Sequence, residues 1–230
     1  AVLAQSAWEQ RRFRLAADFC QRTRAELRGV AASGPEMSAS RGLQSQLGVM
    51  EAESWYRAGL AGGARGDFRS AADAYAAVLR GGAEEIPVPR IGGLMLQRVL
   101  AEIRAGSPEA GKILDGYSGE AAFDTANRWQ AEWALARALQ LQGSEGMREA
   151  YERVNRLLAT EYAAGQAGTV KPELRVRMAW LQARLSFENG DLERTLGLVE
   201  KLVATPVPGD AALRTEIAGT STLLRARAEF

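Results

Sequence analysis

The sequence of 230 residues contains no histidine and a single cysteine, Cys20. Histidine is the side chain that most often transfers protons near neutral pH, and it shares zinc sites with cysteine. A lone cysteine also excludes a disulfide bond within the chain. These absences argue against most classes of enzyme, so we expect a protein without catalytic activity, bound metal or cofactor.

An excess of charge of one sign is also missing, because 29 lysine and arginine residues face 28 aspartate and glutamate residues. The resulting net charge of +1 gives no strong field that would attract nucleic acid or anionic lipid. The chain also lacks an apolar run of about 18 residues, the length that suggests a membrane span. We therefore expect no nucleic-acid partner and no membrane span.

Alanine, with 42 residues, is abundant, whereas lysine occurs only at Lys112, Lys171 and Lys201. Alanine, leucine, arginine, glutamine and glutamate favour helices, and the alternating β-branched runs that are typical of strands do not occur. Aromatic residues make up only 7% of the chain, so the core must be built mainly from leucine, alanine and valine. The composition predicts an all-α fold, and arginine in place of lysine fits a GC-rich bacterial genome.

Glycine, proline and capping residues divide the chain into about ten or eleven predicted helices with short gaps between them. In the turn Arg65-Gly66-Asp67, the aspartate is predicted to cap the helix that follows. The other predicted breaks fall at Gly34-Pro35, Gly81-Gly82, Pro87-Val88-Pro89, Gly106-Ser107-Pro108, Gly116 to Gly119, Gly143-Ser144, Gly165 to Gly168, Asn189-Gly190-Asp191 and Pro206 to Gly209.

Small residues and the cysteine are interpreted as parts of the packing. Cys20 lies on an apolar stripe with Ala16 and Ala17, which predicts a buried structural thiol. The glycines Gly59, Gly62, Gly63 and Gly66 are not followed by Lys-Ser or Lys-Thr, so they do not form a phosphate-binding loop. Their spacing instead predicts close contact between helices.

An internal repeat is present in three stretches that begin at Trp133, Trp180 and Leu223, separated by 47 and 43 residues. Each stretch places a bulky residue, an alanine and an arginine at positions i, i+3 and i+4, which lie on one side of a helix. The three arginines are Arg137, Arg184 and Arg227, and a weaker copy begins at Tyr56.

This pattern resembles the tetratricopeptide repeat family. The best match is residues 52–87, through Trp55, Gly59, Gly66, Ala71, Tyr75 and Pro87, and the next best is residues 176–208. The spacing exceeds the usual period of roughly 34 residues, which implies extended helices or inserted turns, and HEAT-like or other helical-hairpin repeats stay open. The resemblance implies an antiparallel helical-hairpin solenoid, wound as a right-handed superhelix, that forms one domain over residues 1–230.

The resemblance also implies where a partner would bind. In this family the first helix of each pair lines a concave face, and an arginine fork beside an indole ring can hold a carboxylate and an apolar side chain there. The alternative is that the tryptophans belong to the core and the arginines are solvated. The residues that the resemblance places on this face are Tyr56, Leu60, Trp133, Arg137, Trp180, Arg184 and Arg227.

We therefore predict a non-catalytic scaffold that binds a partner protein or peptide along a concave groove. Three alternatives stay open: a self-association module that stacks through open repeat ends into a homo-oligomer, the sensor solenoid of a larger bacterial signalling protein, and a helical lyase or glycan-processing enzyme. The chain begins at Ala1 and ends inside an apparent helix, so we expect a processed product or a fragment. The expected location leans towards the bacterial envelope over the cytoplasm.

Overall fold

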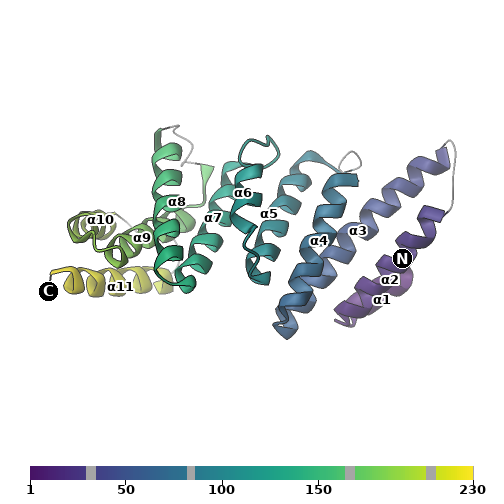
Figure 1. Cartoon of the computed structure of the whole chain (residues 1–230), viewed down its shortest axis with the longest axis horizontal. Helices are drawn as coiled ribbons and strands as arrows, with labels where there is room; N and C mark the ends of the chain where they lie inside the picture. The colour runs from purple at the N-terminus through teal and green to yellow at the C-terminus, as the bar shows by residue number, and fades with distance from the viewer. Residues whose placement is uncertain (30–34, 82–85, 164–168, 206–210, 230) are drawn as a thin grey trace. The chain divides into compact units, whose positions relative to one another are not determined.

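The computed structural model describes residues 1–29, 35–81, 86–163, 169–205 and 211–229, and over these ranges it contains α-helices and short 3₁₀ segments but no strand. The prediction of an all-α fold is confirmed. The described residues form two compact units, Ala1–Asp124 and Thr125–Phe230 (Figure 1). The predicted breaks at Gly165 to Gly168 and at Pro206 to Gly209 lie outside the described residues, and so do Gly34 and Gly82 of two other predicted breaks.

The first unit is a series of helices in which each one contacts the next along the chain. This arrangement buries the apolar stripe of each helix against its neighbours, which no single helix could do alone. The helices are α1 (Val2–Glu9), α2 (Phe13–Gly29), α3 (Pro35–Gly62), α4 (Arg65–Gly81), α5 (Val88–Ala105) and α6 (Ala110–Tyr117).

In the second unit, each α-helix also contacts the next. In addition, α9 (Pro172–Glu188) contacts both α7 (Thr125–Leu139) and α11 (Ala211–Glu229), although one other α-helix separates it from each of them in the sequence. The elements are α7 (Thr125–Leu139), the 3₁₀ turn η2 (Gln140–Gln142), α8 (Ser144–Ala163), α9 (Pro172–Glu188), α10 (Leu192–Ala204) and α11 (Ala211–Glu229).

Small residues allow the helices of the first unit to approach closely. A Cβ atom added to Gly59 would lie 2.8 Å from Cε1 of Phe68, and one added to Gly48 would lie 2.7 Å from Cγ2 of Val78. Close packing through Gly59 is therefore confirmed. The same prediction is wrong for Gly63 and Gly66, which have no such neighbour within 4 Å.

Cys20 is fully buried, as predicted. Burial raises the pKa of its thiol to about 11, because the thiolate would lose its hydration, and the nearby charge of Glu51 acts in the same direction. The thiol is thus a small apolar part of the packing between α1, α2 and α3.

The prediction that Asp67 caps a helix is wrong. Helix α4 already begins at Arg65, and the preceding turn passes through Gly63, which has a φ of +68°. The carboxylate of Asp67 instead accepts hydrogen bonds from Nε and Nη2 of Arg14, at 3.2 and 2.8 Å. Asp67 therefore ties α4 to α2, which are separated in sequence by the whole of α3.

Three helices end in the same turn, and one of them uses an unusual residue. At the ends of α5 and α9, Gly106 and Gly190 adopt left-handed φ angles of +72° and +77°. At the end of α1 this position is occupied by Arg11, with a φ of +58°. The same pair of backbone hydrogen bonds closes the turn, from Arg11 N–H to Trp8 and from Arg12 N–H to Ala7. A side chain at such a position strains the backbone by about 1 kcal/mol, which glycine avoids.

We predict that Arg11→Gly stabilises the protein by about 1 kcal/mol, because it removes the strain of a left-handed arginine. Urea denaturation followed by circular dichroism measures the change. The matched control is Gly190→Ala, which should destabilise the protein by a similar amount. Loss of stability in Arg11→Gly would show that the arginine side chain outweighs the strain.

A buried ion pair joins α7 to α8 in the second unit. Nε and Nη2 of Arg153 each donate to one carboxylate oxygen of Glu132, both at 2.9 Å. The two side chains are only 5% and 9% exposed. Neither charge has ready access to water, so each one depends on the other for its stability inside the protein.

We predict that Arg153→Met destabilises the protein by about 3–5 kcal/mol, because it leaves the carboxylate of Glu132 buried without its partner. Chemical denaturation measures this loss. The double variant Arg153→Met with Glu132→Met should recover most of it. A double variant as unstable as the single one would mean that the ion pair itself, rather than the orphaned charge, supplies the stability.

Candidate binding site

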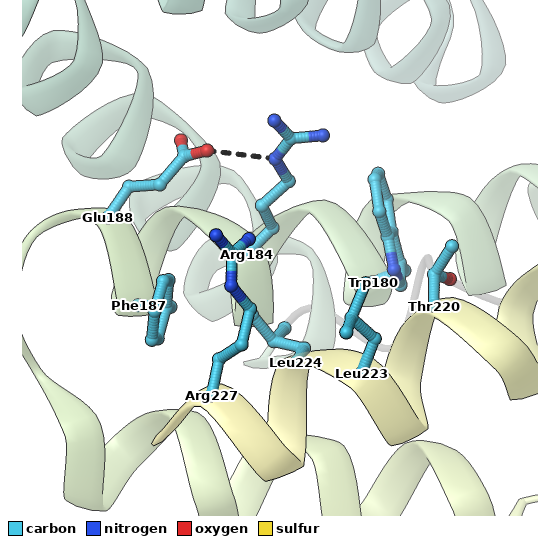
Figure 2. Close-up of a pocket in the computed structure, with 8 residues that line it drawn as sticks. All are labelled: Trp180, Arg184, Phe187, Glu188, Thr220, Leu223, Leu224 and Arg227. Carbon is cyan, nitrogen blue, oxygen red and sulfur yellow. Dashed lines mark hydrogen bonds and ion pairs between the residues drawn. The ribbon is translucent and has the colours of Figure 1, made fainter. Parts of the chain in front are cut away.

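A pocket of about 180 Å³ lies between α9 and α11 in the second unit (Figure 2). It contains three of the residues that the sequence placed on a binding face, namely Trp180, Arg184 and Arg227. Its walls combine aromatic and aliphatic side chains with two arginines and one glutamate. The lining residues are Trp180, Arg184, Phe187, Glu188, Thr220, Leu223, Leu224 and Arg227.

Helical spacing explains how these side chains reach the pocket. Trp180, Arg184 and Phe187 follow one another at i, i+4 and i+7, so they lie along one side of α9. The other side of α9 is anchored by Met178, which is fully buried. On α11, Leu224 packs into the core, while Leu223 stays 59% exposed at the pocket.

Each pocket arginine lies over an aromatic ring. The guanidinium carbon of Arg184 is 5.7 Å from the centre of the Trp180 ring, and that of Arg227 is 6.0 Å from the centre of the Phe187 ring. Such stacking holds the flat guanidinium group while leaving its edge open to hydrogen-bond acceptors. In Figure 2 both guanidinium groups point to the same side of the pocket.

Glu188 orients the guanidinium group of Arg184 through a hydrogen bond. Nε of Arg184 donates to one carboxylate oxygen of Glu188 at 2.9 Å, and the side-chain amide of Gln140 donates to the other at 3.1 Å. Among the described residues, the two terminal nitrogens of Arg184 have no hydrogen-bond acceptor. They are the donors that a ligand carboxylate could use as a pair.

Arg227 differs from its neighbour Arg225 on the same helix. Nε of Arg225 donates to Glu229 at 2.8 Å, and this hydrogen bond raises the pKa of Arg225. Arg227 forms no ion pair with any described residue, and only the Phe187 ring lies beneath it. Arg227 therefore presents an uncompensated positive charge at the edge of the pocket.

Trp133 and Arg137 repeat this arrangement on α7. Arg137 is exposed, and its guanidinium carbon lies 6.0 Å from the centre of the Trp133 ring. Its Nη1 reaches the side-chain oxygen of Gln140 at 3.4 Å, and Gln140 in turn bonds to Glu188. A chain of polar contacts thus connects the arginine of α7 with the arginine of α9.

Tyr56 and Leu60 lie on α3 in the first unit. The Tyr56 ring meets Phe68 edge-on at 5.6 Å, and Arg104 from α5 lies 5.0 Å above it. Partial burial lowers the pKa of Arg104 because the charged form loses hydration. Leu60 is 49% exposed. This group of residues is a further example of an arginine stacked on aromatic rings.

Sequence reasoning missed Phe187, Glu188 and Gln140. Phe187 was detectable, because it lies one helical turn beyond Arg184. The ring beneath Arg227 comes from α9, so no spacing within α11 could have predicted it. The third copy of the repeat also departs from the first two, since Ala226 is exposed whereas Ala136 and Ala183 are fully buried.

Within the described ranges, no group of three or more acidic or cysteine side chains is placed to hold a metal ion. No described helix combines the length and the apolar character needed to cross a lipid bilayer.

No family model matches this chain, and neither the curated proteins nor the solved structures contain a significant match.

Proposed function

We propose that this chain is a non-catalytic scaffold that binds an acidic, partly apolar segment of a partner protein. The observation that supports it best is the pocket between α9 and α11. There two arginines lie over aromatic rings and keep terminal nitrogens without a partner among the described residues.

The charge and shape of the pocket favour a carboxylate ligand. The lining contains two guanidinium groups and a single carboxylate, that of Glu188, so it carries net positive charge although the whole chain is nearly neutral. Arginine forks bind carboxylates with two parallel hydrogen bonds. Leu223 and Phe187 supply apolar surface beside them, and anchoring contacts of this mixed kind dominate protein interfaces.

The proposed architecture is a solenoid of antiparallel helical hairpins that resembles tetratricopeptide repeats over residues 1–230, with a right-handed superhelical path. Its support is the position of the repeat copies, since Trp133, Trp180 and Leu223 lie on α7, α9 and α11. In such a stack the first helices of successive pairs line one face, which is ordered before a partner arrives. Tyr56 and Leu60 would contribute the corresponding positions of α3.

Self-association is a second candidate, favoured by exposed apolar side chains on α1. Val2 and Leu3 are 82% and 65% exposed, and exposed apolar side chains are suited to packing against another copy. In this case the molecular mass measured by light scattering would rise with protein concentration.

We predict that Arg184→Gln combined with Arg227→Gln weakens binding of acidic peptides by about tenfold or more, which corresponds to about 1.4 kcal/mol. The reason is loss of both guanidinium forks. The probe is a fluorescent pool of peptides containing aspartate, leucine, serine and glycine, and a matched pool has asparagine in place of aspartate. Fluorescence anisotropy measures the affinity.

The control variant is Arg225→Gln, which removes a neighbouring arginine that is already paired with Glu229. It should bind like the unchanged protein, and all variants should keep their helical content and melting temperature. Equal binding of the two pools, or equal loss in the control, would contradict the proposed function.

A further inference from the structure

One arginine stacked on an aromatic ring is present on each of three alternate helices of the second unit. We call Arg137 on α7, Arg184 on α9 and Arg227 on α11 the arginine ladder. Their rings are Trp133, Trp180 and Phe187. The ladder is continuous, because α9 contacts both α7 and α11, and Gln140 and Glu188 connect its first two arginines.

We take the separation of neighbouring arginines in the ladder from the usual spacing of the helices that carry them, since α9 contacts both α7 and α11. The axes of helices in contact lie about 8–10 Å apart. A polyproline II segment rises about 3.1 Å per residue with three residues per turn, so it advances about 9 Å per turn and returns every third side chain to the same side. A β-strand of similar length would turn every third side chain to the opposite side.

We infer that the ligand of the arginine ladder is a polyproline II segment with an acidic residue at every third position, so that one carboxylate meets each arginine. This inference rests on the proposed function and specifies the partner's conformation and spacing. Proline suits the intervening positions, because it favours this conformation and places an apolar ring against exposed surfaces such as that of Leu223.

Glu188 sets a limit on the affinity of this face. Its carboxylate already occupies Nε of Arg184, and it lines the same pocket that a ligand carboxylate would enter. Two carboxylates close together repel each other, so the charge of Glu188 opposes an acidic ligand while its hydrogen bond orients the arginine. Glutamine at this position keeps an acceptor for Arg184 but removes the repulsion.

The test compares two synthetic peptides with the same composition. The first repeats Asp-Pro-Pro three times, and the second carries its three aspartates at alternate positions, followed by the remaining prolines. Fluorescence anisotropy at low and at physiological salt should show the first peptide binding at least fivefold more tightly. Glu188→Gln should strengthen binding of the first peptide about threefold, and Arg137→Gln should weaken it, with Arg225→Gln again as the unchanged control.

The possible results distinguish the spacing of the ligand's carboxylates from the proposed function itself. Equal affinities of the two peptides, still lost in Arg184→Gln with Arg227→Gln, would overturn the spacing and leave the proposed function standing. No binding of either peptide above its asparagine version would overturn both. Displacement of the first peptide by an equal concentration of single-stranded DNA would show a general polyanion site and would also overturn the inference.

Discussion

The close approach of neighbouring helices is the constraint on which the rest of this structure depends. Alanine is the most frequent residue among the buried hydrophobic side chains, and glycines at positions 48 and 59 meet Val78 and Phe68 at distances that leave no room for a Cβ atom. A few large aromatic side chains, namely Trp129, Tyr75 and Phe123, are nevertheless fully buried. The rings of Trp133, Trp180 and Phe187 are instead only partly buried, and an arginine lies over each of them.

Arginine has two different roles in this chain, and the structure separates them by their partners. Arg153 and Arg24 reach the buried carboxylates of Glu132 and Glu51 on a neighbouring helix, so they join helices. Arg184 and Arg227 instead lie on rings, and no carboxylate of another described helix pairs with them. The first group accounts for part of the packing, whereas the second group has bonding capacity that the fold does not use.

Sequence periodicity was sufficient for the helical class. It also singled out three residues that line the pocket, because Trp180 and Arg184 are the bulky residue and the arginine of one repeat copy and Arg227 is the arginine of the next. It failed at Asp67 for two reasons. An N-cap can be assigned only where the first residue of the helix is known, and α4 begins at Arg65, before Asp67. The carboxylate of Asp67 also pairs with Arg14, which is distant in the sequence. Sequence periodicity also missed the contact between Phe187 and Arg227, which joins two helices. Contacts of this kind arise from tertiary packing, and no local pattern contains them.

The central claim is that each arginine of the ladder meets its own carboxylate. A double-mutant cycle tests it most directly, by pairing Arg227→Gln with aspartate-to-asparagine changes at each acidic position of the Asp-Pro-Pro peptide in turn. The account predicts a coupling of about 1 kcal/mol or more with one peptide position and almost none with the other two. Equal couplings at all three positions, or none at any, would contradict it.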